Sequence, residues 1–218
     1  EVAQAVFGIA PADRGKIFVE GKEITIQSPM DAISHGIGYL PEDRLRQGLF
    51  LPMSINDNIT ITIVDQLSRR GWLNPPKEQE ISTKMLNLLK IKAPNVFHLV
   101  SSLSGGNQQK VVVAKLLSAR LKILIMDEPT QGVDVGAKAA IHQIMSDLAA
   151  EGFGIVMISS EMPEILGMSD TILVMHEGRV NQIFNREEAN QEILMEAAVN
   201  VDRSFVKKGI DAGLTEDR

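Results

Sequence analysis

The sequence predicts an α/β protein whose core is a mainly parallel sheet. Three short, mainly apolar runs have the length and composition of strands buried inside a protein, at residues 37–40, 123–126 and 154–160, the last with polar residues at its end. The stretches between them carry apolar residues at helical spacing. The central run ends in Asp127 and Glu128, and the carboxyl ends of parallel strands are where open α/β sheets bind ligands.

The pattern of residues 1–36 predicts two short helices and a hairpin before the buried strand at 37–40. Residues 1–8 have apolar residues at helical spacing and end in a glycine, which is typical of a helix C-terminus. Residues 16–20 and 23–26 flank a glycine–lysine turn and indicate a β hairpin. Residues 29–34 indicate a second short helix.

The middle of the chain, from residue 54 to residue 100, has a mainly helical pattern. A capping serine opens residues 54–59, and residues 71–76 form a break that contains glycine and proline. A longer helix is indicated at residues 77–91, with four apolar side chains on one face, namely Ile81, Met85, Leu88 and Leu89. That face is typical of a helix packed on a core, and a docking surface is the alternative.

The C-terminal part predicts two more helices and a second hairpin. A helix is indicated from about residue 137 to residue 150 and ends at Gly152, with inward apolar residues Ile141, Ile144, Met145 and Leu148. Residues 171–176 and 179–184 flank a Glu-Gly turn and indicate a hairpin. Residues 187–199 indicate a helix, and residues 202–218 a polar, loosely held tail.

Residues 103–110 read Leu-Ser-Gly-Gly-Asn-Gln-Gln-Lys and lead into an apolar helical run. A Ser-Gly-Gly turn that enters a helix points backbone N–H groups and the positive end of the helix dipole outward, which suits a phosphate. The two glycines let the backbone approach such a ligand closely. Taken alone, the segment is also typical of a serine-capped helix, so both interpretations stay open.

Asp127 and Glu128 form a second candidate for phosphate chemistry. Alternation along a strand sends their side chains to opposite faces, so one carboxylate can hold a hydrated metal while the other orients a water molecule. Pro129 stops the strand directly after them. The alternative is an exposed acidic loop at the end of a strand.

Together, these segments resemble the ATP-binding cassette (ABC) ATPase family. The matching motifs are Leu-Ser-Gly-Gly-x-Gln at 103–108, Asp-Glu-Pro-Thr at 127–130 and Gly-x-Asp at 132–134, and the resemblance covers about residues 1–185. Asn107–Lys110, with Pro41–Arg44 upstream, is similar to the second, C-terminal cassette of the tandem ATPase subunits of bacterial monosaccharide importers of the ribose, galactose, xylose and rhamnose type.

The resemblance implies a P-loop NTPase-like core with a mainly parallel sheet, antiparallel hairpins and an inserted helical subdomain. It places a partial nucleotide-binding core with a β subdomain at 1–53, the helical subdomain, ending in the signature motif, at 54–110, and more of the core at 111–200. A flexible tail is expected at 201–218. No G-x-x-x-x-G-K-[ST] segment occurs, so the first strand and the phosphate loop of the family are expected to be missing from this chain.

The resemblance also implies roles for individual residues. Ser104, Gly105, Gly106, Asn107, Gln108 and Asp134 are expected to bind nucleotide, Asp127 to hold Mg²⁺ through water, and Glu128 to act in catalysis. Glu42 stands where the family has a glutamine that touches the metal and the attacking water. Ser160 stands where the family has a histidine that contacts the γ-phosphate. For Glu42, an exposed ion pair with Arg44 is the open alternative.

Two cassettes of this family face each other head to tail around their ATP molecules. The resemblance therefore implies that Ser104–Gly106 serve an ATP held by a partner, whereas Asp127 and Glu128 serve the home site. It further implies that the phosphate loop of the full-length second cassette is degenerate, with arginine in place of lysine. The home site is therefore expected to bind ATP and Mg²⁺ but to turn over slowly or not at all.

The expected partners are the N-terminal cassette of the same subunit or a second cassette, the membrane permease and, indirectly, a periplasmic or extracellular sugar-binding protein. The expected place is the cytoplasmic face of the bacterial inner membrane, as a peripheral component. No nucleic acid is expected, because the 218-residue chain has a net charge of -6 and few aromatic residues. The open alternatives are a soluble non-transport ABC ATPase and a catalytically degenerate regulatory module.

Composition restricts the remaining classes. The apolar share of 44% and the charged share of 23% are typical of a globular protein. No apolar run is long enough to span a bilayer, and no signal peptide is visible. The chain has no cysteine, which rules out disulfides and cysteine–metal sites, and its four histidines are scattered.

Overall fold

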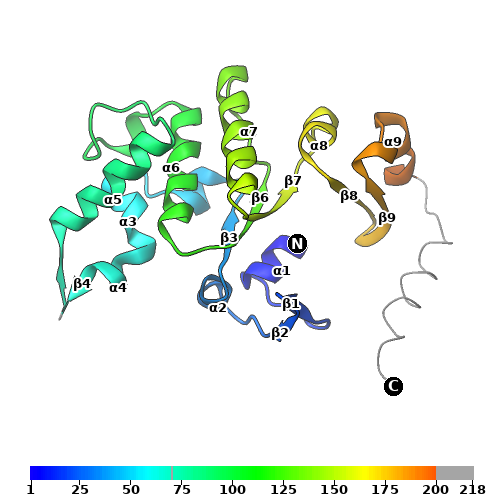
Figure 1. The fold of residues 1–218 in the computed structure, drawn as a ribbon, viewed down its shortest axis with the longest axis horizontal. Helices are drawn as coiled ribbons and strands as arrows, with labels where there is room; N and C mark the ends of the chain where they lie inside the picture. Colours follow the sequence, from blue (N-terminus) through cyan, green and yellow to red (C-terminus); the bar gives the residue numbers. More distant parts are fainter. Residues whose placement is uncertain (70, 200–218) are drawn as a thin grey trace. The chain divides into compact units, whose positions relative to one another are not determined.

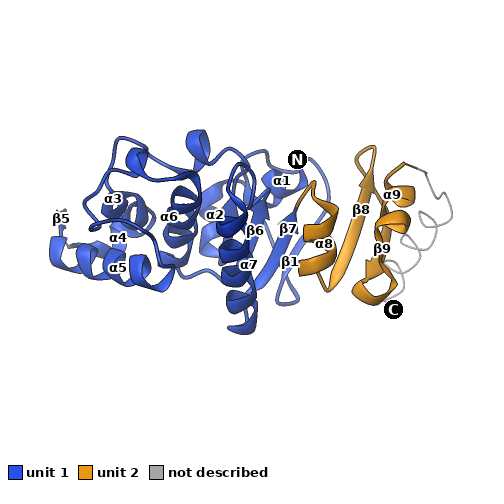
Figure 2. Ribbon diagram, turned by 90° about the horizontal axis from the view of Figure 1, so that it is seen from above, with its two compact units in different colours: residues 1–158 blue, residues 159–218 orange. Residues whose placement is uncertain are grey.

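The computed structural model describes residues 1–69 and 71–199. The chain divides into two compact units, residues 1–158 and the part that begins at residue 159 (Figure 2). Each unit is described by itself below. The tail expected at 201–218 lies outside the described residues, and the finer domain boundaries drawn from the sequence stay a prediction.

Unit 1 contains a three-stranded parallel sheet in the order β3 (Ile37–Leu40), β6 (Ile123–Asp127) and β7 (Gly154–Ile158) (Figure 1). All of β3 and the centre of β6 are buried. β7 differs from the expected buried strand, because alternate side chains along it are exposed, including Val156. The parallel sheet and its surrounding helices confirm the predicted α/β fold class.

Two short helices and a hairpin precede the sheet. They are α1 (Val2–Phe7), β1 (Ile17–Val19), β2 (Lys22–Ile24) and α2 (Pro29–Ser34). As predicted, α1 ends at Gly8, whose φ of 80° and whose N–H bond to the carbonyl of Ala5 form a helix C-cap. The predicted hairpin is present, but its turn is shifted by one residue. Glu20 and Gly21 form it, both with positive φ, so Lys22 belongs to β2.

The middle of the chain is mainly helical, as predicted. Its elements are α3 (Ile55–Thr60), α4 (Val64–Leu67), β4 (Ser68–Arg69), β5 (Trp72–Leu73), α5 (Pro75–Leu88) and α6 (Gly105–Ser118), with short 3₁₀ turns at Ile61–Ile63 and Val100–Ser102 and a π-helical turn at Arg44–Gly48. The predicted cap of α3 is confirmed, because Ser54 and Asp57 form a reciprocal capping box. The break expected at 71–76 contains β5, which pairs with β4 ahead of it in a hairpin that the pattern did not predict.

The predicted apolar face of α5 is only partly correct. Met85 and Leu89 are buried, whereas Leu88 is 57% exposed. A serine takes an inward place instead, since the fully buried Ser82 donates from Oγ to Asn56 Oδ1 at 2.7 Å. A polar side chain can occupy such a place when its hydrogen bond is satisfied inside the protein.

The helix after β6 begins earlier than predicted. α7 spans Val135–Ala150, and Asp134 caps it by accepting from the N–H of Ala137 at 2.9 Å. Ile141, Met145 and Leu148 are buried along it, as expected. The left-handed Gly152 follows its C-terminus and confirms the predicted end.

α6 approaches α7 closely at a glycine. A Cβ atom placed on Gly106 would lie 2.5 Å from the Cβ atom of Ala137. Such a separation is too short for two carbon atoms in van der Waals contact. The close packing of the two helices therefore requires glycine at this position.

Unit 2 contains α8 (Met162–Met168), β8 (Thr171–His176), β9 (Arg179–Asn185) and α9 (Gln191–Val199). β8 and β9 form the predicted hairpin around a Glu177–Gly178 turn with positive φ at both residues. α9 starts later than predicted, because a 3₁₀ turn at Arg186–Glu188 comes first. None of the helices within residues 1–69 and 71–199 is long and apolar enough to cross a membrane.

The contact between α6 and α7 generates a stability prediction. We expect Gly106→Ala to lower the free energy of unfolding by about 1–3 kcal/mol, because the added methyl group must push the helices apart. The companion substitution Ala137→Gly, made in the same chain, should recover part of that loss. Urea denaturation of the purified variants measures both effects.

Gly167→Ala serves as the matched control, since it is also a helical glycine but a Cβ atom there would meet nothing within 4 Å. It should be neutral or slightly stabilising, by about 0.4–1 kcal/mol. If Gly106→Ala behaves like this control, the close approach of the two helices does not restrict the residue at 106.

Candidate functional site

The carboxyl ends of β3 and β6 lie side by side and carry the first group of candidate residues. Leu40 pairs with Met126, so Glu42 follows β3 at the edge where β6 ends at Asp127 and is followed by Glu128. Tyr39 donates from its hydroxyl to Asp127 Oδ2 at 2.9 Å. Burial, and then the hydrogen bond to Asp127, raise the pKa of Tyr39 to about 12. The phenol therefore stays protonated near neutral pH and keeps the Asp127 carboxylate oriented.

Glu128 lies outside the regular strand. β6 ends at Asp127, and Glu128 has a φ of 46°, in the left-handed region that non-glycine residues rarely adopt. Its N–H donates to the carbonyl oxygen of Ile158 at 2.9 Å. The two acidic side chains were expected to alternate as in a strand. That expectation is wrong, because strand geometry does not extend to Glu128.

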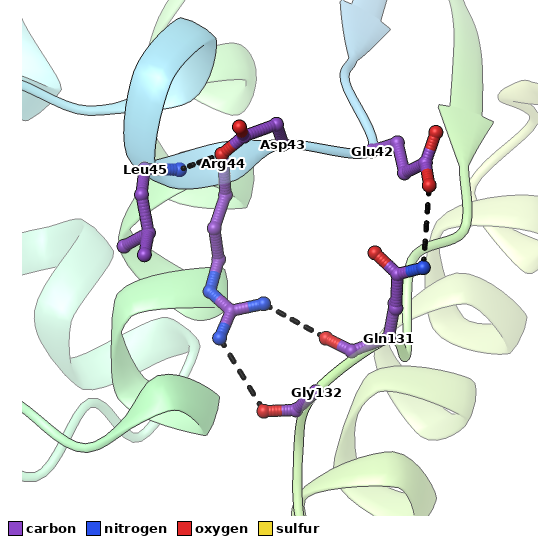
Figure 3. A pocket seen from close by; sticks show the side chains of 6 residues that line it. All are labelled: Glu42, Asp43, Arg44, Leu45, Gln131 and Gly132. Carbon is purple, nitrogen blue, oxygen red and sulfur yellow. Dashed lines mark hydrogen bonds between the residues drawn. The ribbon is translucent and has the colours of Figure 1, made fainter.

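The loop after β3 and the turn after β6 enclose a hollow of about 460 Å³ (Figure 3). It is lined by Glu42, Asp43, Arg44, Leu45, Gln131 and Gly132. Gln131 Nε2 donates to Glu42 Oε1 at 3.3 Å. Arg44 instead donates to two backbone carbonyl oxygens, that of Gln131 at 2.8 Å and that of Gly132 at 3.3 Å. The alternative of an ion pair between Glu42 and Arg44 is thus not what the structure shows.

The N-terminus of α6 presents the second group of candidate residues. Ser104 is exposed at the N-cap position, but its side chain accepts no capping hydrogen bond from the helix. Ser104 Oγ instead accepts from Asn107 Nδ2 at 2.9 Å, and Asn107 Oδ1 accepts from the N–H of Lys92 at 2.8 Å. The alternative, a helix capped by the serine side chain, is therefore wrong. The first-turn amides can face an anion without competition from the Ser104 side chain.

Two glutamines of the same helix point into the protein. Gln108 donates to the carbonyl oxygen of Val100 at 3.3 Å, so its expected contact with nucleotide stays a prediction. Gln109 is 2% exposed and donates to the carbonyl oxygen of Pro129 at 2.8 Å. The residue patterns predict no role for Gln109, although a polar residue ahead of an apolar helical run is a signal that could have identified it. Its bond joins α6 to the segment that follows Glu128.

The two remaining candidates, Asp134 and Ser160, lie in different units. Asp134 uses its carboxylate to cap α7, and a nucleotide contact for it stays a prediction. Ser160 belongs to unit 2, at the start of that unit. Its neighbour Ser159 donates to Glu164 Oε2 at 2.5 Å and accepts from the N–H of Glu161 at 3.0 Å. Unit 1 therefore carries the expected site residues from Glu42 to Asp134, and unit 2 carries Ser160.

The residues at the sheet edge fit a hydrated metal better than a directly coordinated one. Within the described ranges, no three or more His, Asp, Glu or Cys side chains gather as a ligand set. A single carboxylate held by a tyrosine, as at Asp127, suits a Mg²⁺ ion that keeps most of its water. The water-mediated contact expected at Asp127 stays a prediction.

The family model described as ABC transporter matches residues 2–131. The ribose import ATP-binding protein RbsA of Geobacillus kaustophilus is 46% identical over 203 residues, which are 93% of this chain and 41% of that protein. The ribose import ATP-binding protein RbsA 2 of Rhizobium johnstonii is 50% identical over 198 residues, with coverage of 91% and 39%. The chain thus spans about 40% of the length of these relatives.

Solved structures give the same fold. A nucleotide-free ATP-binding cassette of an ABC transporter has a TM-score of 0.74 at 24% identity, covering 94% of this chain and 81% of that one. Another cassette, in an ADP conformation, has a TM-score of 0.72 at 24% identity, with coverage of 96% and 82%. The signature segment, the acidic strand end and the matching family model lead to one conclusion: the chain belongs to the ABC transporter family.

Proposed function

We propose that this chain is an ATP-binding cassette of a bacterial monosaccharide importer and that it couples ATP binding and hydrolysis to sugar uptake. The observation that carries the proposal is the identity of 46–50% with ribose import ATP-binding proteins over more than nine-tenths of this chain. A putative ribose/galactose/methyl galactoside import ATP-binding protein of Hahella chejuensis is 48% identical over 198 residues and widens the range of candidate sugars.

The N-terminus of α6 supplies the signature motif to an ATP held by a partner cassette. Ser104 and Asn107 are accessible there, and the helix carries no acidic side chain in its first turn. Backbone N–H groups and the positive end of a 14-residue helix then stabilise the charge of a phosphate chain. The partner cassette is the N-terminal half of the same subunit.

The sheet edge forms the cassette's own half-site. Asp127 would hold Mg²⁺ through water, Glu128 would orient the attacking water, and Glu42 would face the same nucleotide. ATP with Mg²⁺ supplies the phosphoryl group and the neutralising charge, while the residues of this chain supply positions and hydrogen bonds. Glutamate and serine in place of glutamine and histidine remove a neutral amide and a potential cation. Turnover at this half-site is therefore slow.

A role in sugar import requires two further partners, a membrane permease and a sugar-binding protein. The cassette binds a membrane permease at the cytoplasmic face of the inner membrane and acts with a sugar-binding protein only indirectly. The net charge of -6 gives no support to a nucleic-acid partner. Co-purification from membranes separates this proposal from a soluble ABC ATPase, because a hydrophobic permease should accompany the full-length subunit and nucleic acid should not.

The two half-sites should respond differently to substitution. In the full-length subunit assembled with its permease, Ser104→Ala should lower ATP turnover by about tenfold to a hundredfold, because it removes a donor from the productive site. Glu128→Gln should leave most of the turnover, because it alters the slow half-site. Steady-state ATPase assays on both variants measure the difference. Loss of turnover in Glu128→Gln together with normal turnover in Ser104→Ala would show that the proposed division is wrong.

The isolated 218-residue chain should show almost no ATPase activity, because its sequence contains no G-x-x-x-x-G-K-[ST] segment to bind the phosphates. Phosphate release by the purified chain, measured with ATP and Mg²⁺, checks this expectation. Turnover comparable to that of the assembled transporter would contradict it.

A further inference from the structure

Arg44 occupies the junction between the two groups of candidate residues in unit 1. Its guanidinium donates from one terminal nitrogen to the carbonyl oxygen of Gln131 at 2.8 Å and from the other to that of Gly132 at 3.3 Å (Figure 3). The same group lies against the first residue of α6, since a Cβ atom on Gly105 would come within 2.9 Å of Arg44 Nη2 and 3.2 Å of the Gly132 carbonyl oxygen. One side chain thus contacts two segments that lie far along the chain from its own loop, the turn at Gln131–Gly132 and the start of α6.

The base of this side chain is itself held in place. Asp43 Oδ1 accepts from the N–H groups of Leu45 and Arg46, each at 3.2 Å, and so fixes the turn that carries Arg44. Within the described part of the chain, the buried Nε of Arg44 has no acceptor. The two carbonyl contacts therefore determine the orientation of the guanidinium, and a planar fork is suited to reaching both at once.

We infer that Arg44 is a positioning residue that fixes the first turn of α6 against the turn at Gln131–Gly132 and against the loop that carries Glu42. Gln131 also donates to Glu42. A displacement of the loop that carries Glu42 should therefore also move Gln131 and Gly132, and the Gly132 carbonyl oxygen lies next to Gly105 of α6. Arg44 thereby sets the placement of Ser104 and Gly105, although it touches no reacting atom. The consequence for ATP turnover rests on the proposed function, whereas the positioning itself does not.

The test compares Arg44→Ala with Arg46→Ala in the full-length subunit assembled with its permease. Arg46 is the matched control, because it lies on the same turn with a side chain that is 88% exposed and forms an ion pair with Asp43 at 3.6 Å. Arg44→Ala should lower kcat for ATP by roughly tenfold to a hundredfold, with KM changed by less than about twofold. Arg46→Ala should stay within about twofold of the unaltered protein in both constants.

Arg44→Lys adds a second comparison. An ammonium group keeps the charge but has no planar fork, so this variant should lose most of the kcat that Arg44→Ala loses. Full rescue by lysine would show that charge alone matters and would overturn the inference. A rise in KM with an unchanged kcat would also overturn it, since that result indicates a direct contact between Arg44 and nucleotide.

Hydrogen exchange measured on the same proteins without nucleotide isolates the positioning from the activity. The amides of Gln108 and Gln131 are hydrogen-bonded to the carbonyl oxygens of Ser104 and Glu128. Both should exchange several-fold faster in Arg44→Ala and not in Arg46→Ala. Unchanged exchange would overturn the inference even in an active transporter. If the unaltered transporter showed no ATPase activity, that result would count against the proposed function. The exchange measurement would still decide whether Arg44 positions α6.

Discussion

The placement of β6 between two parallel neighbours is the constraint on which the rest of unit 1 depends. Its backbone pairs with β3 along one side and with β7 along the other, and its central residues are buried. Because all three strands run in the same direction, their carboxyl ends meet at one edge of the sheet. Asp127 is thus brought within reach of Tyr39 and opposite Ile158 by strand register alone. The loops then only refine a site whose position the sheet has already determined.

The second constraint is the link between α6 and the segment after Glu128. Gln109 reaches the carbonyl oxygen of Pro129, and Gly106 lies against Ala137 at the start of α7. Both contacts bind the helix that carries Ser104 to the chain that leaves the sheet edge. Groups that are expected to face two different nucleotides therefore share one packed unit.

Much of this arrangement could be predicted from residue patterns. The strands at 37–40 and 123–126, the capped start of α3 and the end of α7 are local features, set by apolar runs and capping residues. The errors arise where tertiary contacts decide. Leu88 has the right spacing for a core face, yet Ser82 is buried because Asn56 can accept its hydrogen bond. The turn of Glu128 and the reach of Arg44 to the carbonyl of Gln131 depend on segments far along the chain.

The signature glycines illustrate how one residue type can satisfy two requirements. The sequence favours the interpretation that Gly105 and Gly106 let a phosphate approach the backbone. In the folded chain, close packing also requires that these two positions carry no side chain, since Gly105 faces Arg44 and Gly106 faces Ala137. Loss of activity after a glycine-to-alanine change would then not identify a phosphate contact, because displaced helices give the same result. A stability measurement separates the two causes, since only the packing requirement lowers the free energy of unfolding when no nucleotide is present.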